Sequence, residues 1–122
     1  MKILIIDDED DIRAISRLAL GRVGGMDVVD AASGKTGVAR AIAEAPAAIL
    51  LDVMMPDMDG PETFGVLKAE PRTAHIPVIF LTAKAMASEV ERLRSLGAAG
   101  VLTKPFDPMS LAANVRAILG GR

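Results

Sequence analysis

The chain contains no cysteine, tryptophan or tyrosine, and three phenylalanines are its only aromatic residues. Without cysteine it forms neither disulfides nor thiolate metal sites, a composition that fits a reducing compartment. With so few aromatic rings it lacks a platform on which nucleic-acid bases stack. The 14 basic side chains are outnumbered by 16 acidic ones, so no basic surface for a phosphate backbone is predicted. We therefore expect no direct binding of nucleic acid.

Long hydrophobic runs are also missing. The apolar segment that follows Lys2 ends at Asp7, which makes it too short for a signal peptide or a membrane-spanning helix. We therefore predict a cytoplasmic protein without a membrane partner. Its 122 residues, 51% of them hydrophobic, fit one domain with a single core.

Five short apolar runs alternate with segments of helical spacing. Each run has the length and the β-branched content of a strand bounded by turn residues. Between the runs, apolar residues recur three or four positions apart, as in Val38, Ile42 and Ala45, and so line one face of a helix. The pattern predicts an α/β fold of the (βα)5 type, with a parallel sheet covered on both faces. The predicted strands are 3–6, 26–29, 48–51, 77–81 and 98–102.

Local signals predict several helix ends. Gly24 and Gly97 stand where helices should stop. Asp59, with Glu62 three residues later, has the spacing of a capping box that opens a helix. The segment SGKTG at 33–37 is predicted to begin another helix, since it lacks the first glycine of a phosphate-binding loop.

Charged and hydroxyl side chains follow four of the predicted strands. Because the carboxyl ends of parallel strands lie at one edge of the sheet, where ligands bind, these side chains are expected to converge. Carboxylate oxygens suit a hard divalent cation, and magnesium fits best because it keeps waters that a phosphate can displace. The residues are Asp7, Asp8, Asp52, Thr82 and Lys104.

Three further acids follow Asp8 directly. We place Glu9, Asp10 and Asp11 in the first turn of a helix, where the helix dipole favours negative charge. They are therefore interpreted as helix-start residues and not as ligands.

Four motifs occur in order along the chain: IIDDED at 5–10, LLDVMMPDMDG at 50–60, FLTAKA at 80–85 and VLTKPF at 101–106. Together they resemble the CheY-like receiver domain of the two-component response-regulator family, over essentially the whole chain. The resemblance implies a doubly wound, flavodoxin-like fold with strand order 2-1-3-4-5.

The resemblance also implies how the chain is organised. Residues 1–119 would form the receiver (response regulatory) domain, and residues 120–122 a short C-terminal tail. Two arrangements stay open: a stand-alone regulator, and a receiver that belongs to a longer chain.

For the metal site, the resemblance implies a magnesium ion held directly by Asp8, Asp52 and the backbone carbonyl of Met54. Asp7 would act mainly through a bound water. The ion would offset the charge that several carboxylates place beside a phosphate.

For the reaction, the resemblance makes Asp52 the nucleophile that takes a phosphoryl group from a phosphohistidine. The donor would be a sensor histidine kinase or a histidine phosphotransfer protein, and the output partner is unknown. Lys104 and Thr82 would contact the new phosphate, and the Lys104–Pro105 bond would be cis. The chain would be a phosphorylation switch or relay and not an enzyme acting on an outside substrate.

One position departs from the family pattern. Receiver domains usually carry an aromatic residue two places before the threonine of TKP, and here that position is Val101. A valine cannot swing a large ring toward Thr82, so the usual readout is not expected here. The signal would then pass through the loop after Thr82, or the protein would mainly relay phosphate.

Two other functions are compatible with parts of this pattern. A protein-interaction module of the same fold that is never phosphorylated is the first. The second is an aspartate-nucleophile phosphohydrolase of the haloacid-dehalogenase type, which normally needs another aspartate two residues after its nucleophile. Met54 occupies that position, which argues against the enzyme.

Overall fold

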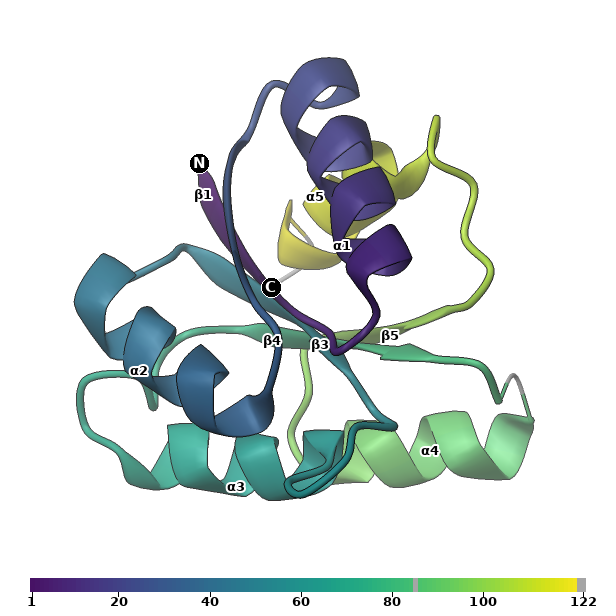
Figure 1. Cartoon of the computed structure of the whole chain (residues 1–122). Helices are drawn as coiled ribbons and strands as arrows, with labels where there is room; N and C mark the ends of the chain where they lie inside the picture. Colours follow the sequence, from purple (N-terminus) through teal and green to yellow (C-terminus); the bar gives the residue numbers. More distant parts are fainter. Residues whose placement is uncertain (85, 121–122) are drawn as a thin grey trace.

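The computed structural model describes residues 1–84 and 86–120. Within them, five parallel strands form one sheet in the order β2-β1-β3-β4-β5, which confirms the predicted α/β, doubly wound class and strand order (Figure 1). The strands are β1 (Lys2–Ile6), β2 (Asp27–Ala31), β3 (Ala48–Asp52), β4 (Val78–Thr82) and β5 (Gly100–Thr103).

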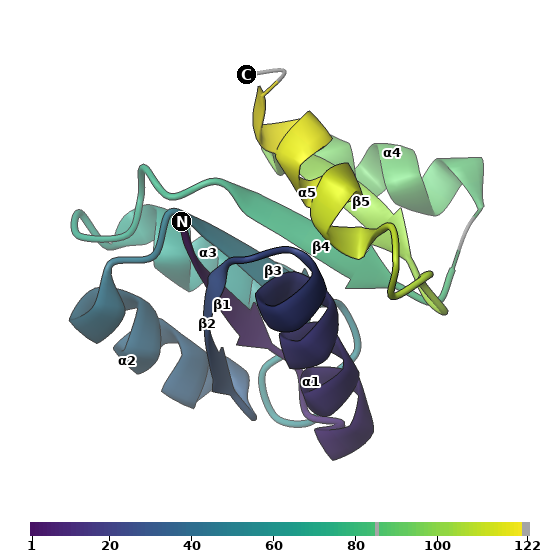
Figure 2. The ribbon, with the colours of Figure 1, turned by 90° about the horizontal axis from the view of Figure 1, so that it is seen from above.

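Helices cover both faces of this sheet. Figures 1 and 2 show α1 and α5 on one face and the other three helices on the opposite face. The helices are α1 (Asp10–Arg17), its continuation η1 (Leu18–Val23), α2 (Gly34–Glu44), α3 (Gly60–Ala69), α4 (Ala87–Ser95) and α5 (Leu111–Gly120).

Two cores lie on either side of the sheet because strand side chains alternate between its faces. From β1, Leu4 and Ile6 pack with the core under α2, α3 and α4, while Ile3 and Ile5 pack with the core under η1 and α5. Burial on both faces explains why the strands are nearly continuous in apolar residues.

The second strand begins one residue later than predicted and ends two residues later. Met26 is buried, but its amide donates to the carbonyl of Leu20 at 2.9 Å and so closes the preceding helix. Pairing with β1 starts only at Asp27, which lies opposite Lys2. Met26 is therefore apolar because it packs in the core, and it is not part of strand β2.

The first helix ends in a π-helical segment, η1, that the sequence pattern did not predict. The amide of Gly24 donates five residues back, to the carbonyl of Ala19 at 3.1 Å. A Cβ atom at Gly24 would come within 2.5 Å of the Cβ of Ala112 in α5. Arg116, also in α5, donates to the carbonyl of Gly24. Gly24 ends the helix as predicted, and it also allows α5 to approach.

The other predicted helix ends are confirmed. Asp59 accepts a hydrogen bond from the amide of Glu62 at 2.9 Å, and Glu62 accepts one from the amide of Asp59 at 3.3 Å, which completes the capping box of α3. Ser33 caps α2, as the SGKTG prediction requires. After α4, Gly97 has a φ of 109°.

Gly120, the first residue of the predicted tail, is the last residue of α5, and residues 121–122 lie outside the described part of the chain. Among the described residues, none of the helices has the length and apolar content needed to cross a membrane.

Candidate functional site

The carboxyl edge of the sheet gathers four acids. Asp7 follows β1 and Asp52 ends the neighbouring strand β3, so the sheet itself sets these two side chains beside each other. With Asp8 and Glu9, they place carboxylate oxygens within 4.8 Å of one another. Asp7 is fully buried and Asp52 is only 4% exposed.

Lys104 supplies the positive charge at this edge. Its Nζ lies 2.8 Å from Oδ2 of Asp7 and 3.1 Å from Oδ1 of Asp52. Oε1 of Glu9 is slightly farther away, at 3.5 Å. One ammonium group, only 11% exposed at its side chain, is thus shared by three carboxylates.

Burial and the neighbouring charges shift the pKa values of Asp52 and Lys104. Burial of Asp52, followed by repulsion from Asp7, raises the pKa of Asp52 to about 6, although Lys104 opposes the shift. Burial disfavours the charged form of Lys104, but its hydrogen bonds and attraction to Asp7 and Asp52 outweigh burial and raise the pKa of Lys104. Lys104 therefore stays charged. For Asp52, the attraction of Lys104 does not fully offset burial and the repulsion from Asp7, so its negative charge is unfavourable.

The donor set fits a magnesium ion. Magnesium prefers carboxylate, carbonyl and water oxygens, and the cluster offers carboxylate oxygens from two neighbouring strand ends. Oδ1 of Asp8 is buried, and within the described residues it has no hydrogen-bond partner. A buried acceptor without a donor is costly, so a cation that binds this oxygen would relieve the cost.

Glu9 is a site residue that the sequence interpretation missed. It lies one residue before α1, with extended backbone angles, and so it is not in the first helical turn. Its amide donates to Oδ1 of Asp7 at 2.9 Å, and its Oε1 lies 3.5 Å from Nζ of Lys104 at the strand edge. Glu9 is the N-cap residue of α1, one residue before the first turn where it was expected, whereas Asp10 and Asp11 do lie in the first turn.

Thr82 ends β4 on the other side of β3. The residue is 2% exposed, and its Oγ1 accepts a hydrogen bond from the amide of Lys84 at 3.0 Å. The amide of Lys104 donates to the carbonyl of Thr82 at 2.8 Å, so the ends of β4 and β5 are joined. As an acceptor toward Lys84, the Thr82 hydroxyl keeps its own hydrogen for another partner.

A cavity of about 260 Å³ lies between the loops that follow β3 and β4. Its lining includes Met54, Thr82 and Lys84. Met54 lies two residues after Asp52, and 67% of it is exposed. Space for a small group therefore exists beside Met54 and Thr82, in the loops that follow β3 and β4.

Two further sequence predictions concern β5 and its end. The Lys104–Pro105 bond is cis, as predicted. Val101 is half-buried and packs against the core under α2, α3 and α4. Its short side chain stays in that core and has no ring to turn toward Thr82.

Comparison with known proteins assigns the family. The sequence model of one protein family, the response regulator receiver domain, matches residues 3–116. The transcriptional regulatory protein PhoP for alkaline phosphatase synthesis from Bacillus subtilis is 38% identical over 97% of this chain and 48% of that protein. The DNA-binding dual master transcriptional regulator RpaA from Synechocystis is 40% identical over 97% of this chain and 48% of that protein. The chain thus spans about half the length of these two relatives.

Solved structures agree with this assignment. Chemotaxis protein CheY4 from Vibrio cholerae matches with a TM-score of 0.87 and 29% identity, over 96% of this chain and 97% of that one. A putative response regulator from Chloroflexus aurantiacus matches with a TM-score of 0.88 and 33% identity, over 98% of this chain and 97% of that one. The sheet order, the acidic edge and these similarities lead to one conclusion: the chain belongs to the two-component response-regulator family and has the fold of its receiver domain.

Proposed function

We propose that this receiver domain accepts a phosphoryl group on Asp52 from a phosphohistidine of a sensor histidine kinase or a histidine phosphotransfer protein. The observation that carries the proposal is a buried carboxylate at the end of β3, 3.1 Å from the ammonium group of Lys104 and within 4.8 Å of three other acids. As the bond from the Asp52 oxygen to phosphorus forms, the bond from phosphorus to the histidine nitrogen breaks. The group stays on the chain itself, so the protein acts as a signalling switch or relay.

Magnesium is the proposed cofactor. Asp8, Asp52 and the backbone carbonyl of Met54 would hold it directly, and Asp7 would act through a water. The buried, unpartnered Oδ1 of Asp8 supports this assignment among the described residues. When bound, the ion neutralises negative charge on the phosphoryl oxygens.

Lys104 and Thr82 are the proposed phosphate contacts. Lys104 already lies between Asp7 and Asp52, so its ammonium group can move onto a phosphoryl oxygen with little rearrangement. The Thr82 hydroxyl, which accepts from the Lys84 amide, retains a hydrogen to donate. Donation to a phosphate would draw Thr82 and the loop behind it toward Asp52.

We further propose that this loop carries the signal. Val101 has no ring to follow Thr82, so movement would pass to residues 83–84 and on to α4. The proposed receiver spans residues 1–119, with 120–122 as a short tail, in a cytoplasmic protein.

The test is incubation of the purified chain with acetyl phosphate, with and without magnesium. Intact-mass spectrometry should show one added phosphoryl group, and both Asp52→Asn and removal of magnesium should abolish it. Labelling that persists in Asp52→Asn would contradict the assignment of the nucleophile. No labelling of the natural chain, by acetyl phosphate or by any kinase, would favour a protein-interaction module that is never phosphorylated.

A further inference from the structure

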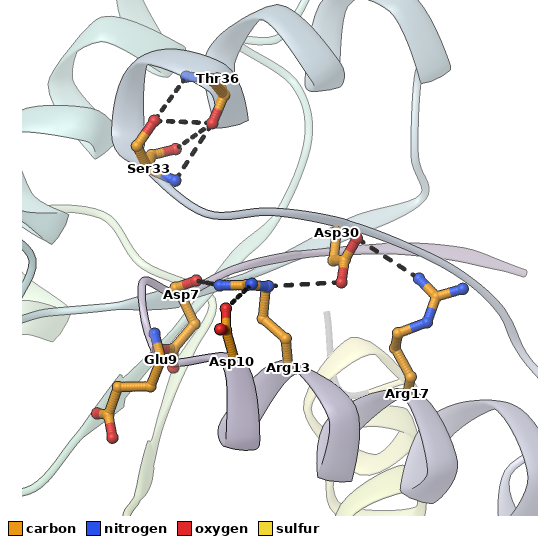
Figure 3. A network of polar contacts seen from close by, with 8 residues as sticks. All are labelled: Asp7, Glu9, Asp10, Arg13, Arg17, Asp30, Ser33 and Thr36. Atoms are coloured by element: carbon orange, nitrogen blue, oxygen red, sulfur yellow. Dashed lines mark hydrogen bonds and ion pairs between the residues drawn. The ribbon is translucent and has the colours of Figure 1, made fainter.

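Arg13, in the second turn of α1, links the acidic edge to strand β2. Figure 3 shows its guanidinium group between Asp7, Asp10 and Asp30. Nη1 donates to the backbone carbonyl of Asp7 at 2.7 Å, and Nη2 pairs with Asp10. Nε lies 3.6 Å from Oδ2 of Asp30, near the carboxyl end of β2. The side chain is only 16% exposed, so these contacts hold it in one place.

The carbonyl of Asp7 belongs to the peptide group that joins Asp7 to Asp8. A hydrogen bond to this oxygen therefore fixes the plane of that peptide and the direction in which the Asp8 side chain leaves the backbone. On the other side of the turn, the amide of Glu9 donates to the Asp7 carboxylate at 2.9 Å. From outside the turn, Lys104 donates to the Asp7 carboxylate, whereas Arg13 donates to the Asp7 carbonyl.

We propose that Arg13 is a positioning residue for the cation site: it holds the Asp7–Asp8 peptide so that the Asp8 carboxylate points into the acidic cluster. This inference rests on the proposed function, because it assumes that the cluster binds magnesium. Asp30 anchors the guanidinium group from β2. Outer-shell groups that orient metal ligands commonly change metal affinity by about 10- to 100-fold when they are removed.

Charge alone makes the opposite prediction. A guanidinium group close to a cation site repels the cation, so its removal should strengthen magnesium binding if Arg13 acts only as a charge. If Arg13 positions Asp8, its removal should weaken binding. The sign of the change in Kd therefore separates the two roles.

Arg17 is a matched control in the same helix. Its Nη1 lies 3.6 Å from Oδ1 of Asp30, so it shares the anchor of Arg13 (Figure 3). The structure shows no bond from it to Asp7 among the described residues. Arg17→Met removes the same charge one turn farther along the helix. It keeps the hydrogen bond from Arg13 to the carbonyl of the Asp7–Asp8 peptide.

The experiment is isothermal titration of the purified chain with magnesium, without any phosphoryl donor. We expect Arg13→Met to raise the Kd for magnesium about tenfold, and Arg17→Met to leave it unchanged or slightly lower. Arg13→Lys keeps the charge but lacks the planar pair of donors, so it should restore part of the affinity. It also serves as the second variant if Arg13→Met does not fold, because any weakening at constant charge comes from lost geometry.

A second readout is the rate of Asp52 labelling by acetyl phosphate as magnesium is varied. A positioning role predicts that Arg13→Met needs about tenfold more magnesium for half-maximal labelling and reaches the natural rate at saturation. A loss of fold would instead lower the maximum. Equal or tighter magnesium binding in Arg13→Met than in Arg17→Met would overturn the inference, while a natural chain that binds no magnesium would overturn the proposed cofactor itself.

Discussion

Strand β3 has two parts with opposite effects on stability. Its first four residues, 48–51, are apolar and no more than 1% exposed, so their burial stabilises the native state. Its last residue, Asp52, is nearly as buried, but burial raises its pKa to about 6 and thus destabilises the native state at neutral pH. The same backbone geometry serves both parts. The stability of the apolar part of β3 thus offsets the cost of a site that is itself unfavourable.

The largest effect is expected in the apolar part. Leu51 is fully buried opposite Ile6 and Phe80, so Leu51→Ala removes buried apolar surface and leaves a cavity. We expect a loss of about 4 kcal/mol in the free energy of unfolding. Urea titration followed by far-UV circular dichroism measures it, since the chain has no tryptophan or tyrosine to report by fluorescence. Leu51→Met, which nearly conserves volume, should cost less than about 1.5 kcal/mol.

The polar end of the strand should behave in the opposite way. The pKa of Asp52 is about 6 in the native state against an ordinary value of 3.8, so its ionisation weakens the fold as the pH rises between these values. Without magnesium, Asp52→Asn should therefore be more stable than the natural chain by about 3 kcal/mol at pH 7, and equal to it below about pH 4.

The control for this pH series is Asp11→Asn on the exposed surface of α1, which removes a charge that the helix dipole favours and so should lower stability at pH 7 by no more than about 1 kcal/mol, opposite in sign to Asp52→Asn. A gain in Asp52→Asn that stays constant from pH 4 to pH 7 would show that ionisation of Asp52 is not its cause.

A smaller effect is expected on the lifetime of the proposed phosphate. Met54 is exposed beside the cavity and has only a weak sulfur acceptor, so it hinders an attacking water without orienting it. Met54→Asn should therefore lose phosphate about tenfold faster than the natural chain, a barrier difference of about 1.4 kcal/mol. First-order decay in excess magnesium measures this. Met109→Asn, at another exposed methionine, should decay at the natural rate.

The smallest effect lies at the start of α3, in the loop that follows the site. Asp59→Ala removes the capping bond to the amide of Glu62 and should cost about 1 kcal/mol of unfolding free energy. Ser33→Ala, which removes the equivalent bond at the start of α2, should cost a similar amount. A much larger loss in Asp59→Ala would mean that the site loop contributes to the core.

The features that could be predicted are those encoded by short sequence patterns. Strands, helix caps and the convergence of Asp7, Asp52 and Lys104 depend on periodicity and on the rule that ligands bind at strand ends. The start of β2 was misplaced because the burial of Met26 in a turn looks the same in a sequence as burial in a strand.

Contacts between distant elements could not be predicted in the same way. The π-helical end of the first helix lies against α5 at Gly24, a contact between distant segments that no local pattern encodes. Glu9 differs from Asp10 only by lying on the other side of a helix boundary, and such boundaries are uncertain by a residue or two. The bond from Arg13 to the Asp7 carbonyl depends on how α1 leaves the sheet.

The position of Lys104 has a consequence for the order of folding. Its ammonium group joins the end of the last strand to Asp7 at the end of the first, across 97 positions of the chain. A chain in which the first four strands have paired and β5 has not docked would hold its acids without this counter-charge, and such long-range contacts form late. The acidic edge therefore becomes complete only when the last strand is in place, and on the proposed function a phosphate on Asp52 would mark molecules that have finished folding.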